Sequence, residues 1–158
     1  MSPTYEDGVD RIDAEVSGDP FGLRPDLQEA IDLFVCNLDW RVLPVRFGDV
    51  YEFDKMLIDK HQAMLTNDVK LITGDNVYEI LHGKDEVIKY FTHCYHKLYT
   101  WTIPLLTIAT SDRVTCHTER VSDCAESQAI TREDVMFIFD MTAANKIKRI
   151  EIRPTRRT

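Results

Sequence analysis

Apolar residues recur every three or four positions in the first part of the chain, which is the spacing of a helix that buries one side. Pro25 and Asp26 favour a helix start, since proline suits the first turn and an acid suits the positive end of the helix dipole. The helix is expected to end near Leu43, because Pro44 follows it. Its predicted buried stripe consists of Leu27, Ile31, Phe34, Val35, Leu38 and Val42.

The same spacing predicts two more helices. A second helix is expected from about residue 50 to residue 65, followed by a short strand over residues 69–73 and a turn at residues 74–76. A third helix is expected to follow Gly83-Lys84-Asp85. Its apolar stripe consists of Val87, Phe91, Cys94, Tyr95 and Leu98.

After Trp101 the apolar residues alternate or run continuously, as they do in β-strands. Helices followed by an antiparallel meander indicate an α+β fold, with the helices covering one face of a curved sheet. Such a cone would enclose a cavity that suits small apolar ligands. The predicted strands lie near residues 102–110, 113–122, 129–140 and 146–153.

Composition and charge narrow the class of protein. A chain of 158 residues, 44% hydrophobic and 29% charged, fits one soluble globular domain. Residues 1–24 hold six acids and two bases and are expected to form a flexible acidic arm ahead of a domain over residues 25–154, with a basic tail over residues 155–158. The net charge of −8 argues against a nucleic-acid partner.

Neither a membrane nor a cofactor is expected from the sequence. No apolar run reaches the roughly 18 residues of a membrane helix, and the polar start does not look like a signal peptide, so we expect a cytoplasmic protein. The four cysteines lack CxxC spacing and the five histidines lack an HExxH pattern, which favours free thiols and no metal site. No phosphate loop, nucleophile elbow or dinucleotide fingerprint occurs, so we expect chemistry without a cofactor.

The order of three short motifs resembles the NTF2-like, or SnoaL-like, superfamily. A helix that ends in Asp68-Val69, a helix opened by Gly83-Lys84-Asp85, and a closing hairpin of residues 137–140 and 146–147 are similar to its pattern. The resemblance spans about residues 25–154 and implies three N-terminal helices packed on a curved, mostly antiparallel sheet that encloses a pocket. The superfamily includes ketosteroid isomerases, scytalone dehydratase, limonene epoxide hydrolases and polyketide cyclases, as well as non-catalytic transport and association domains.

Two local matches suggest site residues. Residues 118–121, Thr-Glu-Arg-Val, resemble a catalytic strand of the limonene epoxide hydrolases, and the matching arginine is Arg120. Ser122 and Ile152 stand where those hydrolases carry their aspartates, which removes two of the three residues of the epoxide-opening mechanism. Residues 134–136, Asp-Val-Met, resemble the strand of ketosteroid isomerase that carries an oxyanion-hole aspartate.

The other two catalytic positions of the isomerase correspond to Thr73 and Arg41, and neither keeps the isomerase's residue type. On a helical wheel Arg41 falls beside Phe34 on the buried stripe, whereas Trp40 falls on the opposite side. A buried arginine needs a partner, so Arg41 is a candidate if the first helix persists. If that helix frays before Pro44, Arg41 turns to solvent instead.

Strand alternation leaves the orientation of the later strands open. Asp134 is the first candidate for a carboxyl group in the cavity, and Glu133 replaces it if the register is shifted by one residue. Arg120 faces inward with Thr118 in the register of the epoxide hydrolases. In the opposite register, His117 and Glu119 would form the acid–base pair.

The hypothesis is a cofactor-independent isomerase or cyclase of secondary metabolism that acts on a polycyclic, apolar small molecule. Asp134 would move a proton, and Arg41 and Arg120 would hold the negative charge that develops on an oxygen. A dehydratase or an epoxide hydrolase of the same fold, or a non-catalytic binding module, remains the alternative. A homodimer through the outer sheet face is expected, because both faces of the strand over residues 129–140 are apolar. The expected substrate-binding residues are Thr73, Phe91, Cys94, Leu98 and Thr118.

Overall fold

The computed structural model describes residues 22–40, 48–74, 79–95, 99–124 and 129–155. Two of the predicted site residues, Arg41 and Leu98, lie outside these ranges, as do most of the N-terminal arm and of the basic tail. The elements in chain order are α1 (Pro25–Cys36), α2 (Gly48–Gln62), β1 (Leu65–Thr73), β2 (Glu79–His82), α3 (Lys84–Lys89), the π-helical segment η1 (Tyr90–Cys94), β3 (Tyr99–Thr110), β4 (Arg113–Cys124), β5 (Ala129–Met141) and β6 (Ile147–Pro154).

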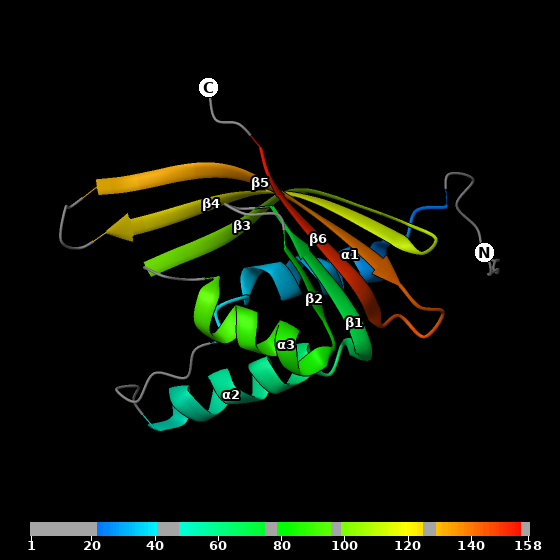
Figure 1. Ribbon diagram of the computed structural model, residues 1–158, viewed down its shortest axis with the longest axis horizontal. Helices are drawn as coiled ribbons and strands as arrows, with labels where there is room; N and C mark the ends of the chain where they lie inside the picture. Colours follow the sequence, from blue (N-terminus) through cyan, green and yellow to red (C-terminus); the bar gives the residue numbers. More distant parts are fainter. Residues whose placement is uncertain (1–21, 41–47, 75–78, 96–98, 125–128, 156–158) are drawn as a thin grey trace, which may run out of the picture.

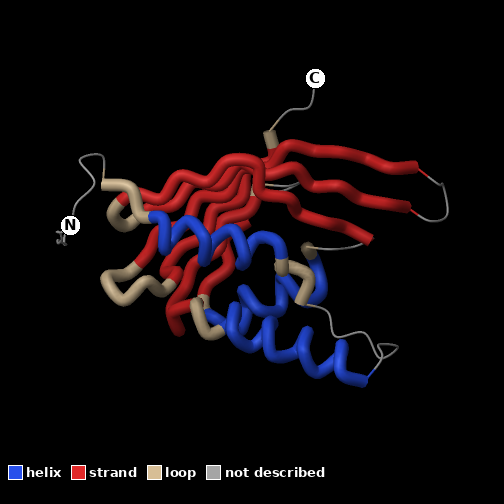
Figure 2. The backbone as a smooth tube through the Cα atoms, turned by 180° about the vertical axis from the view of Figure 1, so that it is seen from behind, coloured by secondary structure: helices blue, strands red, loops and turns tan. Residues whose placement is uncertain are grey.

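One curved sheet carries the helices on a single face. The strand order is β2-β1-β6-β5-β4-β3, with β1 parallel to β6 and every other neighbouring pair antiparallel. α1 and α3 lie against the same side of the sheet, and α2 lies beyond α3 (Figure 1). The view from behind shows the same layering, with β3, β4 and β5 extending past the helices at one end (Figure 2).

The predicted α+β class agrees with the structure, and the strand expected over residues 69–73 is the second half of β1, between α2 and α3. The expected group of three N-terminal helices is not confirmed, because β1 and β2 precede α3. β2 was not predicted because it spans only four residues and is mostly exposed, so it shows no apolar pattern. The sheet is mixed because β1 joins it beside β6, the last strand of the chain.

The first helix ends at Cys36, well before the predicted end near Leu43. Asn37 terminates it, since its backbone N–H donates to the Phe34 carbonyl at 3.2 Å and its side-chain amide donates to the Leu33 carbonyl at 2.8 Å. A helical wheel therefore has no meaning beyond this point. Trp40, which the wheel placed outside, is buried.

The third helix changes its pitch on the side that faces the sheet. The Tyr95 N–H donates to the Tyr90 carbonyl, five residues back, at 3.0 Å. A π-turn holds more residues than an α-turn, so Tyr95 returns to the buried side while Cys94 falls short of it. Cys94 is consequently exposed, and its predicted place in the apolar wall is wrong.

Aromatic rings fill the space between the helices and the sheet. Phe34 of α1 meets Phe139 of β5 edge-on, with ring centroids 5.7 Å apart. Tyr95 connects Phe91, at 5.5 Å, with Phe137 of β5, at 6.2 Å. Such edge contacts stabilise beyond the area they bury, so this cluster fixes how α1 and the third helix sit on the sheet. The side chains of β5 buried beneath it are Val135, Phe137, Phe139 and Met141.

Exposed apolar side chains of the outer face gather on β3, which is an edge strand. A bulge lies between Pro104 and Leu106, and Pro104 suits an edge because it has no N–H to donate. On β5, where the sequence analysis placed the apolar outer residues, Met136 and Ile138 are half-buried. The homodimer expected from the sequence stays a prediction. The exposed apolar residues of β3 are Trp101, Ile103, Leu105, Leu106 and Ile108.

His61 of α2 is a buried titratable side chain, 3% exposed and packed edge-on against Phe34 at 5.8 Å. Its Nδ1 forms no hydrogen bond with any group in the part of the chain that the structure describes. Burial lowers the pKa of His61 because it disfavours the charged imidazolium, and the positive charge of Lys60 lowers it further.

This buried histidine predicts a loss of stability in mild acid. The unfolded chain binds a proton at His61 near pH 6.5, whereas the folded chain resists binding until the pH falls lower. The free energy of unfolding should therefore fall as the pH drops below about 6.5, and it should fall less in a His61→Leu variant. Urea denaturation between pH 7.5 and 5.0 measures the free energy of unfolding of the wild type and of the variant. Exposed His82 supplies the control variant, His82→Gln. An equal fall in wild type, His61→Leu and His82→Gln would contradict the prediction.

Candidate active site

Arg120 and Glu133 pair across β4 and β5 on the face that meets the helices. Nε and Nη2 of Arg120 both donate to Oε1 of Glu133, at 3.1 and 2.6 Å. Oε2 of Glu133 accepts no hydrogen bond from any residue in the described ranges. The arginine side chain is 12% exposed and the glutamate side chain 42%, so the pair lies where the covered face opens to solvent. Arg120 therefore holds Oε1 of Glu133, whereas Oε2 can accept a hydrogen bond or a proton from a ligand.

Tyr95 connects this ion pair to the aromatic cluster. The Cζ atom of Arg120 lies over the Tyr95 ring at 5.3 Å from its centroid, a cation–π contact that orients the guanidinium. The Tyr95 hydroxyl is 3.2 Å from the Thr102 hydroxyl, and both side chains are buried. A charged pair, two hydroxyls and an apolar ring therefore meet at one place.

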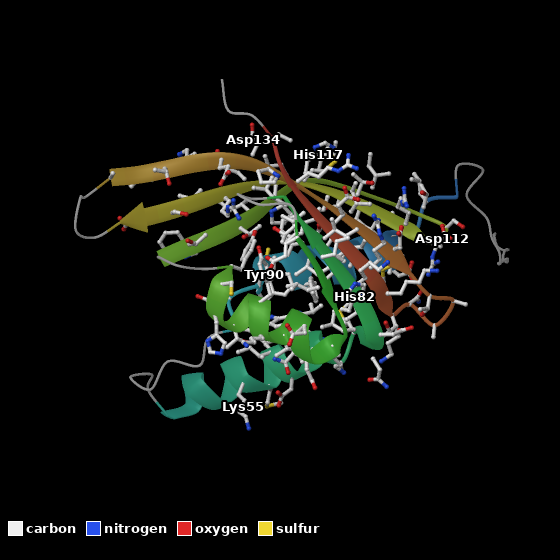
Figure 3. The ribbon with its side chains drawn as sticks, in the orientation of Figure 1. Lys55, His82, Tyr90, Asp112, His117 and Asp134 are labelled. Carbon is white, nitrogen blue, oxygen red and sulfur yellow. The ribbon has the colours of Figure 1, made fainter. Side chains whose placement is uncertain are left out.

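A second pair of hydroxyls lies five residues earlier along the third helix. The hydroxyls of Tyr90 and Thr73 are 3.4 Å apart, and both side chains are buried. Phe91 contacts both tyrosines, with its ring centroid 5.2 Å from Tyr90 and 5.5 Å from Tyr95, and the two tyrosine rings are 6.1 Å apart. Figure 3 shows Tyr90 between the third helix and the sheet.

The outer face of the same two strands carries a second arginine–glutamate pair. Arg132 of β5 donates to Glu119 of β4 at 3.0 Å, but the arginine side chain is 54% exposed and faces solvent. His117 and Asp134 also lie on this outer side, away from the helices (Figure 3). His117 and Glu119 therefore do not face the aromatic cluster.

The preferred placement of Asp134 in a cavity is wrong, and Glu133 takes the inner position that the sequence analysis gave it as a substitute. Side chains of a strand alternate, and Val135 and Phe137 pack against the helices, so Glu133 shares their face and Asp134 must point out. Asp134 is exposed, and its backbone carbonyl accepts a hydrogen bond from the Thr155 N–H at 2.7 Å.

The remaining predicted residues divide by environment. Thr73, Phe91 and Thr118 are buried on the side of the helices, as is most of Arg120. The Thr118 hydroxyl donates to the Val135 carbonyl at 2.7 Å, which gives it a structural role between β4 and β5.

Sequence reasoning missed Tyr90 and Thr102 as polar members of the site and treated Tyr95 only as a core residue. Counting outward from the turn between β3 and β4 pairs Arg120 with Ile103, whereas the bulge in β3 shifts the pairing to Thr102. Tyr90, the first residue of the π-helical segment, was left out of the predicted apolar stripe of the third helix, whereas Tyr95 was part of that stripe. In the sequence, Pro104 was the signal that could have indicated this bulge, because proline within a strand is found at edges and bulges.

The described cysteine and metal-ligating side chains lie as follows. Cys116 of β4 is fully buried, and burial raises the pKa of its thiol to about 11, so it stays neutral near pH 7. No group of three or more histidine, cysteine, aspartate or glutamate side chains in the described ranges is placed to hold a metal ion. Of the helices that the structure describes, none combines the length and apolar character needed to span a bilayer.

Comparison with known proteins identifies the fold. No family model and no curated protein matches the sequence. Solved structures with the same fold include an NTF2-like protein from Anabaena variabilis, which is 13% identical with a TM-score of 0.59 and covers 90% of this chain and 96% of its own. At such identity the likeness shows the fold alone, and the chain has the NTF2-like fold that the sequence predicted.

Two of the similar structures carry names that describe an activity. A putative SnoaL-like polyketide cyclase from Jannaschia sp. CCS1 is 9% identical with a TM-score of 0.60 and covers 88% of this chain and 90% of its own. SalBIII, described as an epoxide hydrolase/cyclase-like enzyme in pyran ring formation in the polyether salinomycin, is 12% identical with a TM-score of 0.59, covering 83% and 92%. Most of the similar structures have no known function, so the fold alone leaves the activity open.

The contact between Tyr95 and Thr102 predicts a measurable contribution to stability. Tyr95→Phe removes one hydroxyl and leaves the buried Thr102 without that partner, so the free energy of unfolding should fall by about 1 kcal/mol. Thr100→Val is the control, because its hydroxyl bond to Ser122, at 3.1 Å, is only partly buried. Guanidinium denaturation compares the two. A loss in Thr100→Val as large as that in Tyr95→Phe would show that burial does not determine the effect.

Proposed function

We propose that this NTF2-like domain is an enzyme that isomerises or cyclises an apolar, polycyclic substrate by acid–base chemistry, without a cofactor. The observation that carries the proposal is the geometry of the Glu133 carboxylate beside the aromatic cluster. Arg120 binds one of its oxygens, and the other accepts no hydrogen bond from the described residues. Two structural neighbours named for cyclisation chemistry on the same fold support the choice of reaction class.

Glu133 would move the proton. Its Oε1 is held by two donors of Arg120, so Oε2 is presented in one orientation and can accept a proton from a substrate carbon or hydroxyl. The same oxygen can return that proton to another atom of the substrate, which balances an isomerisation or a ring closure. No net exchange with water is required.

Arg120 would stabilise negative charge on the substrate oxygen. Its guanidinium is fixed by Glu133 on one side and by the Tyr95 ring beneath it, so little reorganisation is needed when charge develops. The hydroxyl pair of Tyr95 and Thr102 lies next to the guanidinium and supplies further polar contacts. Arg41, which the sequence analysis placed with these residues, is outside the described ranges.

The aromatic cluster would bind the body of the substrate. Tyr90, Phe91 and Tyr95 present three rings in edge contact on the side that faces the sheet. Rings of this kind suit a flat or polycyclic apolar molecule. The hydroxyls of Tyr90 and Thr73 add one polar contact within this surface.

Hydrolytic opening of an epoxide receives less support. Ile152, at one of the aspartate positions of the epoxide hydrolases, is buried in the core. Ser122, at the other, is hydrogen-bonded to Thr100 at 3.1 Å. Neither can activate a water molecule as a carboxylate would.

The proposal predicts conversion without a change in mass. The probes are a β,γ-unsaturated decalone, which can isomerise, and an epoxy alcohol that can close to a pyran, each incubated with the protein in ¹⁸O-labelled water. Mass spectrometry should show products with the mass of the substrate. A product that gains labelled water would indicate a hydrolase, and one that loses water a dehydratase.

Two matched pairs of variants test the assignment of residues. Glu133→Gln should lower the rate by about 100-fold or more, because it removes the proton acceptor, and Arg120→Met should lower it by a similar factor. Glu119→Gln and Arg132→Met remove the outer pair from the same two strands and should leave the rate unchanged. Wild-type rates in folded Glu133→Gln and Arg120→Met would sink the proposal. Absence of both conversion and binding of the probes would favour a non-catalytic module.

A further inference from the structure

Trp40 carries a buried hydrogen-bond donor that none of the described residues accepts. Its side chain is 1% exposed, and its indole Nε1 has no hydrogen-bond partner among the residues that the structure describes. Buried polar groups without a partner are rare in native proteins, because they lose their bonds to water and gain nothing in return. A phenylalanine at this position would keep an aromatic ring without that cost.

The tryptophan belongs to the same line of rings as the candidate site. Its ring centroid lies 5.1 Å from that of Phe91, which lies 5.5 Å from Tyr95, and Arg120 stacks over Tyr95 at 5.3 Å. Three successive contacts therefore lead from the indole to the ion pair with Glu133. Trp40 stands at the inner end of this line, and the half-exposed Glu133 stands at the outer end.

The other unpartnered buried nitrogen near these rings does not share this position. Nδ1 of His61 also lacks a partner within the described ranges, but its ring packs on Phe34. Trp40 contacts both Phe34, at 5.8 Å, and Phe91, so it alone of the two adjoins the rings that lead to the ion pair.

We propose that the indole N–H of Trp40 binds the inner end of the ligand by donating to an acceptor oxygen, a carbonyl or an ether. This inference rests on the proposed function and specifies its substrate class: an apolar ring system with an acceptor oxygen at the end remote from the reacting atoms. An indole N–H donates and cannot accept, so it selects against a protonated amine, an amide N–H or an unsubstituted hydrocarbon at that end. Trp40 therefore determines specificity and takes no part in proton transfer.

Two probes that differ by one oxygen test the inference. 1-Tetralone carries a carbonyl on a bicyclic skeleton, and tetralin is the same skeleton without it. The chain has two tryptophans, so ¹⁵N-labelled protein gives two indole N–H signals. The signal that disappears in Trp101→Phe, which replaces the exposed tryptophan, belongs to Trp101, and the remaining signal belongs to Trp40. Tetralone should move the Trp40 proton signal downfield, as a new hydrogen bond does, and tetralin should not.

Calorimetry of the same probes supplies the second measurement. Wild-type protein should bind tetralone about 2- to 10-fold more tightly than tetralin, the ratio expected for one neutral hydrogen bond. Trp40→Phe should bring this ratio close to one, whereas Arg132→Met, on the outer face of the sheet, should leave it unchanged. If Trp40→Phe does not fold, the shift of the wild-type indole signal still decides.

The possible results distinguish failure of the role proposed for Trp40 from failure of the proposed function. Loss of the ratio in Arg120→Met but not in Trp40→Phe would place the oxygen at the ion pair and overturn the inference alone. An indole proton that exchanges magnetisation with a buried water, and keeps that contact when tetralone binds, would also overturn it. Failure of both probes to bind would contradict the proposed apolar site itself.

Discussion

The pairing register of β4 and β5 determines which charges the helices cover. Arg120 stands opposite Glu133, whereas Glu119 and Arg132, each one residue earlier on its strand, meet diagonally on the other face. Strand side chains alternate, so a shift of one strand by a single residue would turn its inner charge outward. The packing of Phe137 against the third helix holds the register, because the opposite choice would expose that ring to water.

The aromatic cluster stabilises the fold and also forms the apolar part of the candidate site. Tyr95 packs on Phe137, stacks under Arg120 and bonds to Thr102, so one side chain joins the core to the ion pair. It directly follows the π-helical segment η1, where its N–H donates to the Tyr90 carbonyl five residues back. Wide turns of this kind are uncommon and often occur at functional sites.

The NTF2-like fold is compatible with several activities and does not by itself identify the function of this chain. The same cone serves structures named for cyclisation and many whose function is unknown. The proposed function therefore rests on local chemistry: a carboxylate whose second oxygen accepts no hydrogen bond from the described residues, a guanidinium held by Glu133 and Tyr95, and rings beside them. The second arginine–glutamate pair, on the outer face, is a control for the role of these charges, because it carries the same two residue types but is not covered by the helices.

The sequence by itself determined the elements with strong periodicity, the α+β class and the family resemblance. It also identified Arg120 and the two neighbouring acids, Asp134 and Glu133, as the residues of interest. It could not choose between those acids, because both faces of β5 carry apolar residues and only contact with the helices distinguishes them. The end of α1 at Asn37 and the bulge in β3 were likewise set by local hydrogen bonds, which a periodic pattern does not contain. Tertiary packing therefore decided which acid meets Arg120 and brought Trp40 into the core.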